Sequence, residues 1–316
     1  MPRVSVVIPA FNNSAFIDLT IASVLEQTYQ DIELIIADHA SSDDTWDKLR
    51  RYADHPHVTL AQTPAGGGAV ANWNAVSQRA SGEFIKLLPG DDLLHPTCIA
   101  RQVQAFDDAA SQRSADTVGF VAAQRSLIDA RGGVVMRARG LGKLDGLVDG
   151  KQALRATVRS GTNLFGEPGA VLMRTDMLRQ QGWWQDLHYY IDAGSYAPVI
   201  AQGAMVAIRQ PLASFRLSAS QWSVRLMRSQ AQEAAAFHRQ VRALAPDVVT
   251  DADVRRGDRM AKLQAMQRRA SYLVLKKRME AEPDTQASAP TGDLAAAGDK
   301  TVTQGVTDVT VEKDSQ

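Results

Sequence analysis

The sequence predicts an α/β protein with a mixed, mostly parallel, Rossmann-like sheet flanked by helices, followed by a C-terminal helical extension. Through residues 4–96, short apolar runs alternate with helical segments, which is the order that right-handed strand–helix–strand crossovers produce. Each apolar run is followed by a polar or glycine-rich loop. Beyond about residue 224, helical periodicity and basic residues replace the strand pattern.

The first half of the chain alternates predicted strands with predicted helices. The strands are short and rich in β-branched residues, as expected for parallel strands covered on both faces. The helices show apolar residues on one face, or begin directly after a glycine loop. The predicted strands are residues 4–9, 32–37, 58–62 and 84–88, and the predicted helices are residues 17–27, 45–52 and 69–80.

The second half is less regular, and it completes a mixed sheet. We expect helices at 99–106 and near 150–158, hairpins and loops over 124–165, and strands at 118–123, 170–174, 205–208 and 212–217. The tail has almost no large apolar side chain and is expected to be disordered. The predicted units are a main domain over 1–224 (halves 1–96 and 97–224), a helical extension over 225–281 and the tail over 282–316.

The composition is that of an ordinary globular protein and excludes several classes. Apolar residues make up 45% of the 316 residues and the formal net charge is zero, so no nucleic-acid partner is expected. The single cysteine, Cys98, excludes a disulfide framework and a multi-cysteine zinc site. No apolar run has the length of a transmembrane helix, and the N-terminus lacks a signal-peptide pattern. We therefore expect a cytoplasmic protein.

Polar residues follow each of the four early strands. They are Asn12, Asp38, the glycine loop 66–68, and the pair Asp91 and Asp92. Because parallel strands share one direction, these four loops should meet at one edge of the sheet. Adjacent aspartates in a turn often only cap a helix, but paired oxygen ligands beside a phosphate site also suit Mg²⁺ or Mn²⁺. The convergence of four polar loops predicts a ligand site.

Five motifs in this region together resemble the nucleotide-sugar-binding half of family 2 inverting glycosyltransferases, which have the GT-A fold. The resemblance covers residues 3–96, and the motifs follow one another at the family's spacing. The motifs are VSVVIPAFNN, the helix end SVLEQTY, the strand and acidic loop ELIIADHASSDDT, the glycine loop and helix GGGAVANWNAV, and the strand and turn GEFIKLLPGDD.

The resemblance implies that the first half binds a nucleotide-sugar donor together with Mn²⁺ or Mg²⁺. By this analogy Asp91 coordinates the cation that bridges the donor diphosphate, and Asp92 lies close to the donor sugar. The other positions carried over would contact the base, the ribose or the sugar, and they are Pro9, Ala10, Asn12, Asp38, Ser41, Gly67 and Asn72.

The second half resembles the family less closely. The segment 166–174 looks like the acceptor-side strand and loop, which implies that Glu167 binds substrate. Asp192 falls where the family places its catalytic carboxylate, with Asp186 as the reserve candidate and a helix-capping role as the alternative. A sugar hydroxyl is a poor nucleophile near neutral pH, so a carboxylate must take its proton during attack. The resemblance therefore implies that Asp192 is the general base.

The sequence also departs from the family pattern. His39 follows Asp38 where a second acid is common, Pro89 replaces the first acid of the metal motif, and Ile191 replaces the first acid of the catalytic pair. The phosphate-contacting histidine of the closing loop is absent, and Ser218 stands near its place, with Arg216 either as its substitute or in a structural salt bridge. These departures leave one alternative open, a degenerate relative that binds a nucleotide sugar or a partner without turnover.

The expected reaction moves a sugar from a nucleotide-diphosphate sugar, in first place a UDP-sugar, to an acceptor hydroxyl with inversion. By family analogy the acceptor is a glycan or a lipid-linked sugar in bacterial polysaccharide synthesis. An NAD enzyme is disfavoured because the glycine pattern 66–71 follows the third strand rather than the first. His55 and His57 lie in a polar turn without further ligands, so a surface loop is favoured there over a metal site.

A basic helix is predicted around residues 255–278, where apolar residues recur in steps of three and four between arginines and lysines. The favoured interpretation is that its apolar stripe packs on the core or mediates self-association. The alternative is that the helix lies on an anionic membrane, which would bring the enzyme to a lipid-linked acceptor at the inner face of the membrane.

Overall fold

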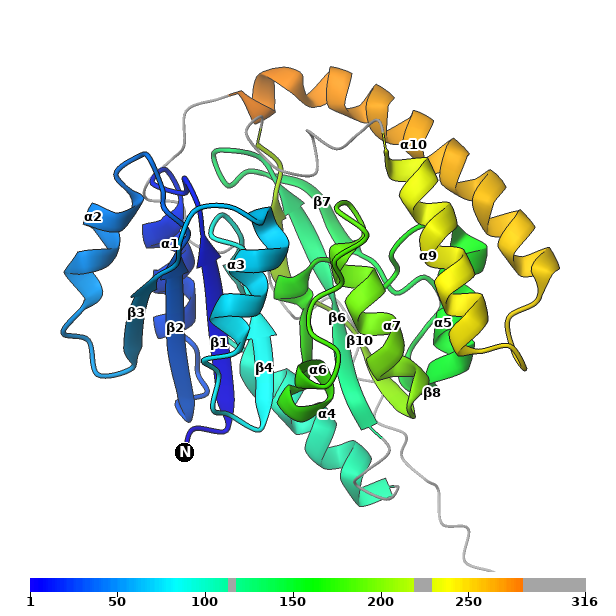
Figure 1. Cartoon of the computed structure of the whole chain (residues 1–316), viewed down its shortest axis with the longest axis horizontal. Coiled ribbons are helices and arrows are strands. Elements are labelled where there is room, and N and C mark those ends of the chain that lie inside the picture. The colour runs from blue at the N-terminus through cyan, green and yellow to red at the C-terminus, as the bar shows by residue number, and fades with distance from the viewer. Residues whose placement is uncertain (113–117, 219–228, 281–316) are drawn as a thin grey trace, which may run out of the picture.

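One mixed sheet of ten strands forms the centre of the computed structural model, which describes residues 1–112, 118–218 and 229–280. The strand order is β3-β2-β1-β4-β9-β6-β10-β5, and two further strands pair at its margins, β7 with β6 and β8 with β10. Helices cover both faces of this sheet, and two long C-terminal helices lie at one side and across its upper edge (Figure 1). The predicted fold class is confirmed.

The first four strands are parallel and lie next to one another. They are β1 (Val4–Ala10), β2 (Ile32–Asp38), β3 (Val58–Gln62) and β4 (Phe84–Leu87). The last residues of the first three strands are in register, with Ala10 opposite Asp38 and Asp38 opposite Gln62. The loops that follow these strands therefore leave the sheet at one edge, as the sequence predicts.

Alternate residues of the central strands enter two separate cores, as the period of a β-strand requires. In β1, Val4, Val6 and Ile8 belong to the core beneath α1 (Ile17–Leu25) and α4 (Cys98–Gln112), and Val7 belongs to the other. That second core lies beneath α3 (Gly68–Ser77), α5 (Gly150–Ser160) and α7 (Ile191–Ala201). Two-sided burial explains why these strands read as continuous apolar runs.

The remaining elements mostly lie where the sequence places them. Antiparallel β9 joins the two halves of the sheet because it pairs with both β4 and β6. The remaining elements of this part of the chain are α2 (Thr45–Leu49) with the 3-10 turn η1 (Arg50–Tyr52), β5 (Leu93–Leu94), β6 (Val118–Ile128), β7 (Val134–Arg139), β8 (Gly146–Asp149), η3 (Pro168–Ala170), β9 (Val171–Arg174) and α6 (Thr175–Arg179).

Three boundary predictions are corrected. The strands expected at 205–208 and 212–217 are one strand, β10 (Ala204–Arg216), whose register shifts on both sides of Pro211. Proline has no N–H to donate to the ladder, so the strand passes it as an irregularity rather than ending there. Strand β6 and helix α4 both extend well past the ends predicted at residues 123 and 106.

The two C-terminal helices are α9 (Gln230–Leu244) and α10 (Asp251–Met279). A capping box between Thr250 and Asp253 starts α10, and Asp253 also pairs with Arg155 and Arg159 of α5. At its far end, Arg278 pairs with Asp129. The helix thus docks on the rest of the chain, as the favoured interpretation predicts, but through ion pairs and the buried Ala261 and Ala265. The large apolar residues of the predicted stripe, Leu263, Met266 and Leu273, are exposed instead. The predicted disordered tail lies outside the described residues.

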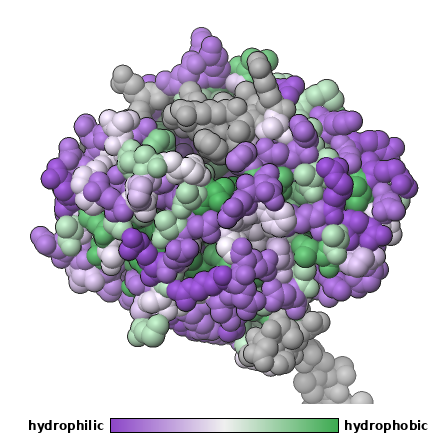
Figure 2. All heavy atoms as spheres, viewed as in Figure 1, coloured by the Kyte–Doolittle hydropathy of each residue, from purple (hydrophilic) through white to green (hydrophobic). Residues whose placement is uncertain are grey.

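The face in Figure 2 is largely hydrophilic, and apolar side chains show mainly in gaps between polar ones. Within the described ranges 1–112, 118–218 and 229–280, no helix combines the length and the apolar character needed to cross a membrane.

Candidate active site

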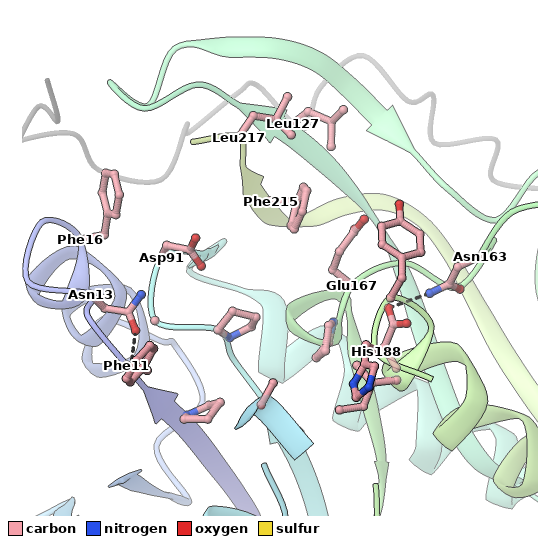
Figure 3. Close-up of a pocket in the computed structure, with 18 of the residues that line it drawn as sticks. Phe11, Asn13, Phe16, Asp91, Leu127, Asn163, Glu167, His188, Phe215 and Leu217 are labelled. Atoms are coloured by element: carbon pink, nitrogen blue, oxygen red, sulfur yellow. Dashed lines mark hydrogen bonds between the residues drawn. The ribbon is translucent and has the colours of Figure 1, made fainter. Parts of the chain in front are cut away.

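A cavity of about 1260 Å³ opens at the edge of the sheet where the first four strands end. One wall consists of the loops that follow β1–β4. The opposite wall comes from the 162–168 loop, the start of α7, the β6–β7 hairpin and the face of α10 that lies above the sheet. Figure 3 shows Asp91 at one side of this space and Glu167, Asn163 and His188 at the other.

Of the eleven residues predicted to bind substrate, act in catalysis or hold the metal, six line the cavity. Those that line the cavity are Pro9, Asn12, Asn72, Asp91, Glu167 and Asp192. Those that do not line it are Ala10, Asp38, Ser41, Gly67 and Asp92. Of this second set, Ser41 and Ala10 are hydrogen-bonded to residues that line the cavity, Asn12 and Asn72, and Asp38 is bonded to Ser41.

Asn12 links the first two loops. Its φ of 51° lies in the left-handed region, which asparagine tolerates better than most residues. Its N–H donates to Ser41 Oγ at 3.0 Å, and its side-chain Oδ1 accepts from the Ser42 N–H at 2.8 Å. Ser41 in turn donates its N–H to Asp38 Oδ2 at 3.3 Å. Ser41 therefore links the loops that follow β1 and β2, although it does not line the cavity itself.

Two buried oxygens at the donor side lack a hydrogen-bond donor within the described part of the chain. One is Asp38 Oδ1, on a side chain that is 1% exposed, and the other is Asn72 Oδ1. Asn72 is oriented by its Nδ2, which donates to the Ala10 carbonyl at 3.2 Å. An unsatisfied buried acceptor costs about 1–3 kcal/mol, so such atoms are usually met by a ligand or by water.

His39, one of the departures from the family pattern, connects the second loop to the third. Its Nε2 donates to the Gly66 carbonyl at 2.9 Å, because a carbonyl can only accept. Its Nδ1 lies 2.7 Å from Thr63 Oγ1. An ionised carboxylate could not donate to Gly66, so the histidine makes a bond that the common acid cannot.

Asp91 and Asp92 point in different directions. Asp91 faces the cavity, and burial raises its pKa to about 6 although the Arg216 charge lowers it. Asp92 is 2% exposed, and its Oδ1 accepts from the Arg216 N–H at 2.9 Å. Burial and the neighbouring Asp91 charge raise the pKa of Asp92. The structure therefore does not bring Asp92 to the cavity, where the resemblance places it beside the donor sugar.

Arg216 is a buried brace beneath the Asp91 loop. Its Nε donates to the Asp91 carbonyl at 2.8 Å, and its Nη1 donates to the carbonyls of Asp129 and Ala130 at 3.2 Å each. Its guanidinium carbon lies 4.6 Å from the centroid of the Phe16 ring. Arg216 does not line the cavity, so it does not take the place of the missing phosphate-contacting histidine.

Asp192 faces the cavity from the first turn of α7. Its Oδ2 accepts from Asn163 Nδ2 at 2.9 Å, shown by a dashed line in Figure 3, and its Oδ1 accepts from the Ala193 N–H at 2.6 Å. Burial raises the pKa of Asp192 to about 7, and the charge of Glu167 adds to this effect. The N-cap of α7 is Tyr190, so Asp192 is not the capping residue. Asp186 is exposed and outside the cavity.

Glu167 lies in the cavity wall between Asp91 and Asn163 in Figure 3 and forms a two-pronged ion pair with Arg125. Burial alone would raise the pKa of Glu167, but the Arg125 charge and hydrogen bonds hold it below its usual value. Paired carboxylate–guanidinium groups of this kind are geometrically fixed. Glu167 is therefore a charged, oriented wall residue.

Several cavity residues were not predicted from the sequence. Those on α10 recur at helical spacing on one face of the helix. This polar stripe is the sequence signal from which the α10 residues could have been predicted. The missed residues include Asn13, Arg139, Asn163, His188, Gln264, Gln267, Arg268 and Tyr272.

Comparisons with known proteins agree with this geometry. Residues 5–145 match the family model described as Glycosyl transferase family 2. These residues belong to glycosyltransferase family 2. A 107-residue segment is 37% identical to the Escherichia coli UDP-Glc:alpha-D-GlcNAc-diphosphoundecaprenol beta-1,3-glucosyltransferase WfaP, covering 34% of this chain and 42% of the relative. The Pasteurella multocida chondroitin synthase is 35% identical over 107 residues, which are 34% of this chain and 11% of that protein.

Solved structures show that the chain has the GT-A fold. Residues 1–349 of Staphylococcus aureus TarS, in complex with UDP, align with a TM-score of 0.58 and 15% identity over 85% of this chain and 72% of that one. The Pyrobaculum calidifontis mannosyltransferase PcManGT, in complex with GDP-Man and Mn²⁺, aligns with a TM-score of 0.57 and 20% identity, covering 86% and 75%. At these identities the likeness concerns the fold.

The residues around Asp91 fit one kind of metal site. Among the residues that the structure describes, no three His, Cys, Asp or Glu side chains gather to hold a metal. Apart from its own N–H, no described group donates a hydrogen bond to the Asp91 carboxylate, so its oxygens remain available. Mg²⁺ and similar cations bind through one or two carboxylates when substrate phosphates supply other ligands. The glycosyltransferase site therefore fits a cation that arrives with the donor.

Proposed function

We propose that this family 2 glycosyltransferase moves a sugar from a UDP-sugar to a hydroxyl of a glycan or lipid-linked acceptor, with inversion, in bacterial glycan synthesis. The observation that carries the proposal is that Asp91 and Asp192 face one cavity, from the donor-side loops and from the start of α7. The relatives named for UDP-glucose and for chondroitin synthesis support this class of substrates.

The donor side has the groups that a uracil nucleotide requires. Asn72 lines the cavity and its Oδ1 can accept a hydrogen bond, and uracil offers an N–H donor where cytosine has an acceptor. Asp38 Oδ1 is also an unsatisfied acceptor, although Asp38 does not itself line the cavity. Phe11 lines the cavity, is 50% exposed and stands edge-on to His39, which leaves an aromatic surface for stacking. These features support UDP as the nucleotide, with contacts at the base and ribose.

Asp192 supplies the general base in this proposal. A carboxylate whose pKa is near 7 combines substantial ionisation at neutral pH with real proton affinity, which suits proton abstraction from a sugar hydroxyl. The proton passes to Asp192 as the acceptor oxygen bonds to the anomeric carbon and the diphosphate leaves. Asn163 orients the Asp192 carboxylate for this transfer.

The leaving diphosphate and the stereochemistry complete the proposal. Mn²⁺ or Mg²⁺ held by Asp91 and the diphosphate would neutralise the charge that the leaving group acquires. Glu167, the other carboxylate near Asp192, is neutralised by Arg125 and is not free to act as a nucleophile. A single displacement with inversion follows from one base without an opposing nucleophile.

The test is an acceptor-dependent release of UDP. Purified protein with Mn²⁺ is incubated with UDP-, GDP- and dTDP-sugars and either a GlcNAc-diphospholipid, the acceptor class in the name of WfaP, or neutral oligosaccharides. We expect UDP release with one sugar, and NMR of the product should show the opposite anomeric configuration to the donor. Retained configuration would contradict inversion. Binding of a nucleotide sugar without any transfer would favour the degenerate relative.

Membrane contact through α10 stays a prediction, as does a cytoplasmic location. The helix contains nine Arg or Lys and three Asp, in a chain whose net charge is zero. Its outer face exposes Leu263, Met266 and Leu273 at 42%, 59% and 78%. Co-sedimentation with anionic liposomes at low salt tests the contact, and its absence would contradict it.

A further inference from the structure

Two arginines that line the same cavity as Asp192 have no carboxylate partner among the residues that the structure describes. Arg139 is the last residue of β7, and Arg268 lies on α10. Neither forms an ion pair within residues 1–112, 118–218 and 229–280, whereas the nearby Arg125 is neutralised by Glu167. This part of the wall therefore carries an excess of positive charge.

Arg268 is held firmly by neutral groups. Its Nη1 donates to Gln230 Oε1 at 2.9 Å and to the hydroxyl of Tyr189. Its guanidinium carbon lies 5.4 Å from the centroid of the Tyr189 ring. The helix that carries it is fixed at both ends, by the Asp253 and Arg278 ion pairs. These contacts orient the Arg268 charge without cancelling it.

Arg139 is held less tightly and repelled more strongly. Among the described residues, its side chain donates only to Met136 Sδ, at 3.9 Å, and thioether sulfur is a weak acceptor. Burial lowers the pKa of Arg139, and the charge of Arg125 lowers it further. Arginine nevertheless stays protonated in proteins, so the repulsion persists. A half-buried cation in this position would be stabilised by a bound anion.

We propose that Arg139 and Arg268 form a subsite for an anionic group, phosphate or carboxylate, carried by the acceptor. Guanidinium groups bind both anions through paired hydrogen bonds. The contacts of both arginines are with the wall that carries Asp192 and not with the Asp91 loop. Arg268 bonds Tyr189, three residues before Asp192 in the chain, and Arg125, which pairs with Glu167, donates its Nη1 to the Arg139 carbonyl at 3.3 Å. The inference rests on the proposed function, because it assigns the anion to the acceptor.

The subsite predicts a class of acceptor. A sugar that carries a phosphate, a diphosphate or a uronic acid near its reacting hydroxyl would place the negative charge on Arg139 and Arg268 while the hydroxyl meets Asp192. Neutral acceptors of the same shape would leave both guanidinium groups unmatched and should bind more weakly.

The experiment measures anion binding while the donor site is filled. Wild type and the variants Arg139→Gln, Arg268→Gln and Arg259→Gln are saturated with UDP and Mn²⁺ and titrated with glucose 1-phosphate, with methyl glucoside as the neutral match. Arg259 is an exposed α10 residue outside the cavity and serves as the control. Thermal melting checks that each variant folds, and Arg139→Gln breaks no strong contact.

Glucose 1-phosphate should bind wild type and the Arg259 variant alike, and about tenfold more weakly to each cavity variant, because a hydrogen bond to a charged group contributes about 1.5–3 kcal/mol. Methyl glucoside should not distinguish the four proteins. Equal binding of the phosphate to all four would overturn the subsite. Weakened binding of UDP itself in the cavity variants would assign the anion to the donor and overturn the acceptor assignment. Absence of UDP binding by wild type would instead contradict the proposed function, and glucose 1-phosphate binding is then scored without nucleotide.

Discussion

The two walls of the cavity are built in different ways. The donor wall comes from loops that follow four adjacent parallel strands, and each loop is tied to its neighbour by side-chain hydrogen bonds, such as those of Asn12 and His39. The acceptor wall combines β6, β7, the 162–168 loop, α7 and α10, which are far apart in the sequence. The first wall is defined locally and the second by tertiary packing.

This difference has a functional consequence. Chemistry common to nucleotide-sugar enzymes, at the base and the diphosphate, lies on the wall that local sequence determines. In the proposed function, the acceptor contacts the wall where a single helix, α10, supplies several residues. Changes in α10 can therefore alter the acceptor without disturbing the donor site, and the following predictions test that separation.

Replacing the general base should have the largest effect. Asp192→Asn removes the proton acceptor but keeps its shape, so we expect kcat to fall by about 10²–10⁴-fold with UDP binding unchanged. Rate measurements and calorimetry on the same preparation check both parts. Asp186→Asn, at an exposed position, is the control and should retain activity. Unchanged turnover in the Asp192 variant would contradict its role as the general base.

Removing the buried brace should affect stability more than chemistry. Arg216→Met leaves the carbonyls of Asp91, Asp129 and Ala130 without their donor, and we expect a loss of about 2–4 kcal/mol in the free energy of unfolding. Urea denaturation measures this loss. Arg209→Met, which removes hydrogen bonds at an exposed site, should cost much less. Equal losses in both variants would contradict a stabilising role of Arg216 beneath the Asp91 loop.

The pH dependence of turnover should report Asp192. Its pKa is raised to about 7 by burial and by the charge of Glu167, while Asn163 and Arg125 oppose the rise. Because the base acts only when ionised, kcat should fall as the pH drops through 7, approaching tenfold per unit below it. Asn163→Ala removes a hydrogen bond to the carboxylate, so this acidic limb should move to higher pH. If the acidic limb does not move, the hydrogen bond from Asn163 does not affect the pKa of the general base.

Much of the donor wall could be predicted because its determinants are contiguous. Apolar strands followed by Asn12, Asp38, the glycine loop and Asp91 imply one sheet edge, and the structure places the loops there. The direction of Asp92 could not be predicted, because it depends on the N–H of Arg216, which is distant in sequence. Successive residues in a turn rarely face the same space.

The acceptor wall could be predicted only in part. Asp192 reaches the cavity as the family resemblance implies, yet nothing local shows that Asn163 orients it. The polar stripe of α10 reads like an ordinary solvated face, because glutamine and arginine at helical spacing are compatible with solvent as well as with a cavity. Only packing against α5 and α9 turns that stripe toward the site.

The most direct test of one cavity with two functional walls is the calorimetry of UDP binding to wild type, Asp91→Ala and Asp192→Asn, with and without Mn²⁺. We predict metal-dependent binding to wild type, its loss in Asp91→Ala and its retention in Asp192→Asn. Absence of binding with metal present, or binding that Asp91→Ala leaves unchanged, would contradict the account.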